Sequence, residues 1–173
     1  VGSIFFNQGE SCNAPSRLLV EASIKDQFME RALKLIPQYA PADPLDPNTV
    51  MGAIVDETQM QNVMRYIEAG KSGGAKLLAG GEQVRRETGG YYVAPTVFDN
   101  VRNDMTIARE EIFGPVLAVL KADDFTHALQ LANNTRYALT GGVYSRQPSH
   151  LERARNEFRV GNLYLNRKIT GAQ

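Results

Sequence analysis

Cys12 is the single cysteine of the chain, and its thiol is the strongest nucleophile that the sequence offers. It belongs to a short segment of glycine and small polar residues, Gly9-Glu10-Ser11-Cys12-Asn13, ahead of an apolar run. Such a loop can present a thiol to a cleft, and its backbone N–H groups can stabilise negative charge on an oxygen. No histidine lies nearby in sequence to act as a base, so this pattern alone favours a small buried hydrophobic residue over a catalytic one.

Two adjacent carboxylates, Glu110 and Glu111, form the second candidate for chemistry. They are followed by Ile112, Phe113 and a Gly-Pro pair. Carboxylates at the end of an element can accept hydrogen bonds from the hydroxyls of a ligand, and an aromatic side chain beside them can pack against its ring. The same pattern also fits charged residues that end a helical turn, with Phe113 in the core. From the pattern alone this second interpretation is favoured.

The composition excludes several other kinds of site. The chain has 173 residues with 19 Lys and Arg, 19 Asp and Glu, and two histidines. A net charge of zero provides no long-range field for a polyanion, so we expect no nucleic-acid partner. One cysteine and two distant histidines, His127 and His150, predict neither a disulfide framework nor a metal site. No apolar run approaches the length of a bilayer span, and no signal-peptide pattern is visible, so we expect no membrane partner and a cytoplasmic location.

The elements that position these residues alternate between strand and helix. The most apolar strand, 115–120, is predicted to be buried on both faces. A helix is predicted after the first strand, because apolar residues recur there at helical spacing: Ile24, Phe28, Ala32, Leu33 and Ile36. Three prolines between 41 and 47 predict a loop. The predicted strands are 16–20, 76–78, 91–93, 95–98, 115–120, 142–145 and 162–166.

Three further helices are predicted from their N-terminal caps. Asp56 precedes a helix with Met60, Val63, Met64 and Ile67 on one face. Asp123 or Asp124 begins the next one, and Ser149 with Glu152 forms a capping box for the last. The strand–helix–strand–helix–strand order near the end of the chain predicts right-handed crossovers and a mainly parallel sheet. The fold class is therefore α/β.

The two candidate motifs together resemble those of a known family. Residues 5–12, FFNQGESC, resemble the catalytic-cysteine segment of the aldehyde dehydrogenases, and 110–116 is similar to that family's E-E-I-F-G-P-V motif. Both occur in the family's order and at about its separation. The resemblance implies a three-layer α/β domain with a mainly parallel sheet flanked by helices. It further implies that residues 1–173 are the cysteine-bearing catalytic domain, incomplete, and that the cofactor-binding domain is absent; no G-x-G-x-x-G follows a predicted strand.

The resemblance also implies roles for individual residues. Cys12 is expected to add to an aldehyde as a thiohemiacetal, which loses hydride to the nicotinamide of NAD or NADP and becomes a thioester. Glu111 is expected to bind the ribose hydroxyls of that cofactor, and Phe113 to pack beside its nicotinamide end. Phe6 and Ser11 flank the thiol and are candidates for the aldehyde channel. The partners implied are therefore a small-molecule aldehyde and a nicotinamide cofactor, with no metal.

The last third of the chain resembles one subfamily. Residues 137–145 and 160–172 are similar to the bacterial pyrroline-carboxylate dehydrogenases, which oxidise L-glutamate γ-semialdehyde to L-glutamate in proline catabolism. By that resemblance Gly171 and Ala172 bind the α-carboxylate of the substrate through backbone N–H groups. The subfamily usually has serine directly after the catalytic cysteine, and here that residue is Asn13, which can still donate a hydrogen bond to substrate. The segment 5–7 is more similar to broad-specificity, betaine- or aminobutyraldehyde-type enzymes, which are the alternative.

The parts of the family that are not found in these 173 residues set further expectations. The general-base glutamate and the oxyanion asparagine of the family lie upstream of the cysteine, and its oligomerisation strand lies downstream. We therefore expect the chain alone to be inactive, and the full-length form to be a homo-oligomer. Preference for NAD or NADP is not predicted, because the residues that read the 2′ position lie in the cofactor-binding domain. A catalytically silent domain with a structural or assembly role is the remaining alternative.

Overall fold

A four-stranded sheet forms the centre of the computed structural model, which describes residues 2–169. Its strand order is β1 (Arg17–Glu21), β6 (Val116–Ala122), β5 (Thr96–Asp99) and β2 (Lys76–Ala79). β6 pairs in parallel with both β1 and β5, whereas β2 is antiparallel to β5. The sheet is therefore mixed and mainly parallel, and the α/β prediction is confirmed.

Strand β6 carries the core on both of its faces, as the continuous apolar run predicted. Successive side chains of a strand point to opposite faces. Leu117 and Val119 belong to one buried cluster, with Val20 of β1. Val116, Ala118 and Leu120 belong to the other, with Phe98 of β5. A strand in this position tolerates no polar side chain on either face without an unpaired group.

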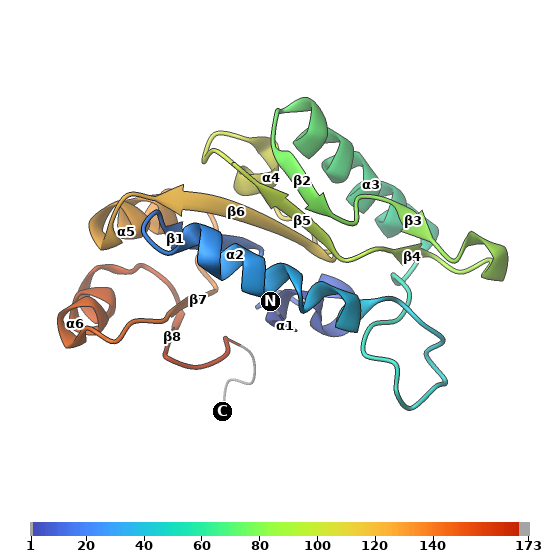
Figure 1. Cartoon of the computed structure of the whole chain (residues 1–173), viewed down its shortest axis with the longest axis horizontal. Coiled ribbons are helices and arrows are strands. Elements are labelled where there is room, and N and C mark those ends of the chain that lie inside the picture. Colours follow the sequence, from blue (N-terminus) through green and yellow to red (C-terminus); the bar gives the residue numbers. More distant parts are fainter. Residues whose placement is uncertain (1, 170–173) are drawn as a thin grey trace.

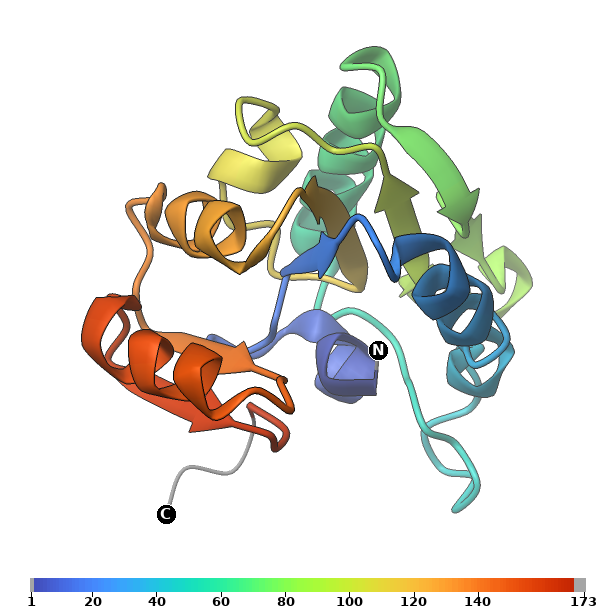
Figure 2. The same cartoon turned by 60° about the vertical axis from the view of Figure 1, so that its left-hand side comes forward.

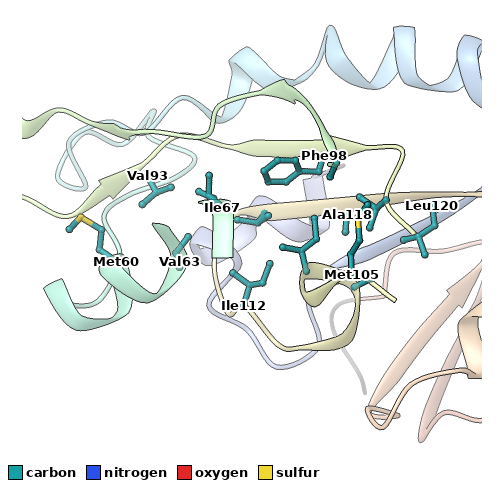
Figure 3. Packing of buried hydrophobic residues seen from close by; sticks show 14 of the residues in the cluster. Met60, Val63, Ile67, Val93, Phe98, Met105, Ile112, Ala118 and Leu120 are labelled. Atoms are coloured by element: carbon teal, nitrogen blue, oxygen red, sulfur yellow. The ribbon is translucent and has the colours of Figure 1, made fainter. Parts of the chain in front are cut away.

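Helices cover both faces of the sheet and give the fold three layers (Figure 1). α3 (Glu57–Ser72) and the short α4 (Thr106–Arg109) contribute to the first cluster, in which Ile67 and Phe98 lie close together (Figure 3). α1 (Gly2–Phe5) and α2 (Lys25–Leu33) contribute to the second. Because β1 and β6 are parallel neighbours, the segments that precede them lie at the same end of the sheet.

The end of the chain forms a smaller unit beside this sheet. β7 (Thr140–Val143) and β8 (Asn162–Leu165) pair in parallel and are joined by α6 (Pro148–Glu157). Figure 2 shows this unit below α5 (Phe125–Asn133), which itself packs on β1 and β6. The parallel strand–helix–strand order is as predicted, but the first strand starts two residues earlier than the predicted 142–145. Within the described part of the chain the pair is also separate from the main sheet.

The remaining elements are short, and the segment 40–55, with its three prolines, contains no helix or strand. Among residues 2–169 no helix combines the length and the apolar character that a membrane span requires. The short elements are η1 (Phe6–Gly9), η2 (Ile36–Tyr39), β3 (Gln83–Val84), η3 (Arg86–Thr88) and β4 (Tyr92–Val93).

Two of the three predicted helix starts are confirmed. The side chain of Asp56 accepts a hydrogen bond from the backbone N–H of Gln59, and that of Asp124 accepts one from His127. The capping box at Ser149 is wrong. α6 begins after Gln147, which makes no side-chain cap, and Pro148 stands in the first turn. Proline suits that position because its fixed φ is helical and its missing N–H would have no helical partner.

The predicted buried face of α2 is only partly correct. Ala32 and Ile36 are buried as predicted, but Ile24 is 52% exposed and Phe28 is 36% exposed, and the buried Met29 was not predicted. The helix is turned so that its first residue, Lys25, reaches into the sheet and forms an ion pair with Asp99. Apolar spacing does not report such a charged contact, so it assigned the wrong side chains to the core.

Candidate active site

Cys12 lies on an exposed turn and not in the core, so the interpretation as a buried hydrophobic residue is wrong. The turn is closed by a hydrogen bond from the backbone N–H of Ala14 to the carbonyl of Ser11, 2.9 Å long. Three consecutive residues before it have a left-handed backbone, Asn7 (φ 49°), Gln8 (φ 57°) and Gly9 (φ 73°). This reversal carries the chain out of α1 to Cys12, which lines a cavity of about 800 Å³.

Two glycines bring the cysteine turn against the second motif. A Cβ on Gly9 would overlap the backbone carbonyl of Gly114, and a Cβ on Gly114 would overlap the side chain of Val63 on α3. The backbones of segments about one hundred residues apart therefore touch, with no room for a side chain between them. Gly9 also has a positive φ, which L side chains rarely adopt.

Replacing Gly9 with alanine is therefore expected to destabilise the chain more than the same change at another left-handed glycine. Gly74→Ala is the matched control, because Gly74 has φ +87° but open space around its Cβ position. The control is expected to cost about 1–2 kcal/mol from the left-handed backbone alone. Gly9→Ala adds the displacement of the Gly114 carbonyl and should exceed the control by at least about 1 kcal/mol in urea unfolding. Equal losses would mean that the contact between the two turns is unimportant.

The second motif forms a turn between α4 and β6. Glu110 ends α4 in an extended conformation, and Glu111 is exposed on the turn. Ile112 is buried and fixes the turn to the core. Phe113 has φ 55° and is 40% exposed. The interpretation that placed its ring in the core is therefore wrong.

Side chains from two other elements hold this turn. The amide of Gln59 on α3 donates to the carbonyls of Ile112 and Phe113 at 3.1 and 2.7 Å. The backbone N–H of Glu111 donates to the hydroxyl of Tyr137 at 3.4 Å, and Arg136 donates to the same hydroxyl at 3.1 Å. The turn is thus tied to α3 on one side and to the segment before β7 on the other.

Two ionisable groups near the turns have shifted pKa values. The hydroxyl of Tyr66 donates to the Glu110 carboxylate at 2.8 Å, and this hydrogen bond, with some burial, raises the pKa of Tyr66. Burial raises the pKa of Glu10, and the charge of Asp56 adds to the rise. A hydrogen bond from the Val55 N–H opposes it. Both carboxylates are therefore engaged in hydrogen bonds with neighbouring segments of the chain.

The cavity collects four of the predicted site residues along one wall. Ser11, Cys12, Glu111 and Phe113 all line it. Phe6 is 62% exposed and, like Asn13, is not among the described residues that line the cavity. Gly171 and Ala172 lie outside the described residues.

Asn13 is nevertheless connected to the thiol turn. Its side-chain oxygen accepts a hydrogen bond from the hydroxyl of Ser11 at 2.7 Å. Its backbone carbonyl accepts one from Thr140 at 3.3 Å, which links the turn to the start of β7. The two residues on either side of Cys12 therefore fix each other as well as the turn.

The groups on this wall suit an organic ligand with hydroxyls and an aromatic ring. Glu111 offers a hydrogen-bond acceptor, and Phe113 offers an apolar surface on the same turn. Within residues 2–169 no group of three or more His, Cys, Asp or Glu side chains is arranged to hold a metal ion. A carboxylate acceptor and an exposed aromatic ring on one turn are also what the family resemblance implied for the ribose and ring end of a nicotinamide cofactor.

The comparison with protein families decides the assignment. The model of the aldehyde dehydrogenase family matches residues 1–173. The chain belongs to the aldehyde dehydrogenase family. The family resemblance inferred from the two motifs is thus confirmed.

Relatives and solved structures within the family share this part of their fold. The 1-pyrroline-5-carboxylate dehydrogenase of Bacillus subtilis (strain 168) is 46% identical over 172 residues, which are 99% of this chain and 33% of that protein. An indole-3-acetaldehyde dehydrogenase of P. syringae, AldA, in complex with NAD+ and IAA, superposes with a TM-score of 0.96 at 48% identity over 98% of this chain and 34% of that one. A 1-pyrroline-5-carboxylate dehydrogenase from Thermus with bound NAD gives 0.92 at 48% identity over 99% and 32%. The chain thus spans about a third of the length of these aldehyde dehydrogenases.

Several residues that shape the site were missed in the sequence. The sequence pattern places Gln59 only on an amphipathic helix, and Tyr137 only in a segment that resembles a subfamily. Neither has a local signal, because each acts on a turn that is distant in sequence. Gly9 and Gly114 stood inside the quoted motifs, and their pairing could have been suspected from the glycine in each.

Proposed function

We propose that this chain provides the nucleophile of an aldehyde oxidation, as the cysteine-bearing part of an NAD(P)-dependent aldehyde dehydrogenase. The observation that carries the proposal is the position of Cys12, exposed in the same cavity as Glu111 and Phe113. Family membership and the oxidoreductase names of the relatives support it. An exposed thiol adds little to the stability of the fold, because an apolar group stabilises it mainly when it is buried.

Cys12 performs the covalent steps. Its thiolate attacks the aldehyde carbon, and the carbonyl oxygen becomes the alkoxide of a thiohemiacetal. Loss of hydride from that carbon restores the C=O bond as a thioester. Water then adds to the thioester, and the carboxylic acid leaves with release of the thiol. Covalent capture divides a difficult oxidation into easier steps. The alkoxide requires fixed N–H donors, for which we propose the backbone N–H of Cys12.

Glu111 and Phe113 hold the cofactor in this proposal. NAD or NADP supplies the hydride acceptor when bound. The Glu111 carboxylate accepts hydrogen bonds from the hydroxyls of the nicotinamide ribose, and the Phe113 ring packs beside the same end. Solved relatives in complex with NAD+ or with bound NAD support a nicotinamide cofactor. The rest of its binding surface, the general base and the oligomer contacts would come from the other two thirds of a complete enzyme.

For the substrate we propose L-glutamate γ-semialdehyde, which a complete enzyme would oxidise to L-glutamate. Eight curated relatives at 42–46% identity are named 1-pyrroline-5-carboxylate dehydrogenases, and their names support this choice. The second candidate is an aldehyde of another class, such as an aminobutyraldehyde. It is favoured by a γ-glutamyl-γ-aminobutyraldehyde dehydrogenase from Burkholderia cenocepacia, with a TM-score of 0.95 at 46% identity. Ser11 and Asn13 beside the thiol, Phe6, and the segment with Gly171 and Ala172 are the residues we propose to distinguish the two.

A chimeric enzyme tests the proposal. This chain replaces the matching third of the B. subtilis 1-pyrroline-5-carboxylate dehydrogenase, and NADH formation is followed by its ultraviolet absorbance with a panel of aldehydes. We expect turnover that depends on NAD, with the highest kcat/KM for glutamate γ-semialdehyde. The unsubstituted B. subtilis enzyme is the positive control. A folded chimera that oxidises none of the aldehydes would contradict the proposed function, and one selective for aminobutyraldehydes would contradict the substrate.

The thiol itself can be tested in the 173-residue chain. A cysteine placed for catalysis is expected to react with iodoacetamide at least as fast as a small model thiol at the same pH, because Cys12 is exposed. The label is located by mass spectrometry after proteolysis. Reaction much slower than the model thiol would favour a catalytically silent domain with a structural role.

A further inference from the structure

Phe113 has a backbone conformation that its side chain does not favour. Its φ of 55° lies in the left-handed region, where bulky residues are rare because Cβ crowds the following carbonyl. Such a conformation persists only where the surroundings determine it. In an extended conformation the ring would leave the cavity wall, so the contacts that hold this backbone also hold the ring in place.

Gln59 makes the contacts that determine this conformation. The carbonyl of Ile112 belongs to the peptide before Phe113, and the carbonyl of Phe113 belongs to the peptide after it. Both accept a hydrogen bond from the same side-chain nitrogen of Gln59, at 3.1 and 2.7 Å. One NH₂ group therefore fixes the two peptide planes whose rotation defines φ and ψ of Phe113.

Gln59 is itself held firmly. It stands in the first turn of α3, where its backbone N–H donates to the capping carboxylate of Asp56 at 2.8 Å. α3 is anchored in the core through Val63, which is fully buried and packs against Gly114. The helix thus provides a rigid base from which the amide of Gln59 reaches the turn.

We propose that Gln59 is a positioning residue, which keeps the Phe113 ring and the neighbouring Glu111 carboxylate on the cavity wall for the nicotinamide cofactor. The effect on cofactor binding rests on the proposed function, whereas the hydrogen bonds of Gln59 to the turn do not. Gln59 acts through the turn, so its loss should weaken the binding of the cofactor and leave the binding of the aldehyde nearly unchanged.

Amide hydrogen exchange in the 173-residue chain tests the geometry. Gln59→Leu removes both hydrogen bonds at nearly constant size. The amides of Glu111 and Val116 donate to Tyr137 and Gly114 on either side of Phe113, and they should exchange about tenfold faster, because the turn opens more easily when about 1 kcal/mol of hydrogen bonding is lost. Gln61→Leu is the matched control. The Gln61 side chain lies on the same helix and donates to Glu57. Its loss should change the exchange rates of those two amides by less than about twofold, because it makes no contact with the turn. If the leucine variant does not fold, Gln59→Glu takes its place. It keeps the length of the side chain but sets an acceptor against the two carbonyls, so the same two amides should again exchange faster.

Kinetics of the chimera test the consequence. For Gln59→Leu we expect the KM for NAD to rise about tenfold, while the KM for the aldehyde stays within about twofold, as for loss of interactions that serve the cofactor alone. Unchanged exchange of the two amides would overturn the proposal whatever the kinetics. Faster exchange with equal effects on both KM values, or with none, would also overturn it. An inactive unsubstituted chimera would count against the proposed function, and the exchange measurement would then decide the role of Gln59 by itself.

Discussion

Replacing Cys12 with alanine in the chimera is expected to lower kcat for aldehyde oxidation by on the order of 10⁴- to 10⁶-fold, the range found when a covalent nucleophile is removed. Without the thiol there is no thiohemiacetal, and hydride must leave from a free aldehyde or its hydrate. The cavity wall is not altered by the change, because Cys12 is exposed and its turn is closed by a backbone hydrogen bond. Binding of NAD should therefore remain within about twofold, as for a substitution outside the contact.

The control for this prediction is the fold of the variant. The free energy of unfolding of Cys12→Ala should lie within about 0.5 kcal/mol of the unsubstituted chain, as for an ordinary surface substitution. A loss of activity together with a large loss of stability would leave the chemistry unproven, so Cys12→Ser is measured in parallel as a second small side chain. Retention of more than about 1% of kcat by Cys12→Ala would contradict a covalent mechanism, since it would leave the nucleophile worth less than about 3 kcal/mol.

The strands and most helices could be predicted because their signals are local. A continuous apolar run gave β6, and its burial on both faces follows from its composition. Asp56 and Asp124 were recognisable as caps because a carboxylate satisfies N–H groups only two or three residues away. The cysteine and the 110–116 motif were found in the same way, as short segments with a family resemblance.

What could not be predicted depends on contacts between distant segments. The meeting of Gly9 with Gly114 and the bonds from Gln59 to the 112–113 carbonyls require the three-dimensional fold. The exposure of Phe28 was misjudged for a related reason. The spacing of apolar residues predicts how a helix is turned only when apolar contacts determine its orientation. In α2 a charged residue also contributes to the orientation.

That residue is Lys25, whose ion pair with Asp99 has the largest effect on stability that we expect in this structure. The ammonium and the carboxylate are 2.6 Å apart, and the two residues are 8% and 9% exposed. The pair joins the first turn of α2 to the end of β5. The other carboxylate oxygen of Asp99 accepts a hydrogen bond from the Asn100 N–H at 2.7 Å, so the charge of Asp99 is doubly satisfied.

Asp99→Ala is expected to lower the free energy of unfolding by about 3–5 kcal/mol, because it leaves the Lys25 ammonium buried without a partner. The pair itself stabilises much less than this, since desolvation of two charges offsets most of their attraction. Lys25→Met combined with Asp99→Asn removes both charges and should therefore recover the stability to within about 1 kcal/mol of the unsubstituted chain. The free energies are obtained from urea unfolding, with m-values compared to confirm that the same surface is exposed.

An exposed pair on the same helix provides the matched control. Lys34 and Glu30 are also 2.6 Å apart, but their side chains are 69% and 68% exposed. Glu30→Ala should cost only about 0.3–0.5 kcal/mol, because water screens the attraction and solvates the lysine that remains. The two single variants thus remove contacts of equal length that differ in burial. Similar losses for Asp99→Ala and Glu30→Ala would show that the interior around Lys25 admits water, and that α2 is oriented by its apolar contacts after all.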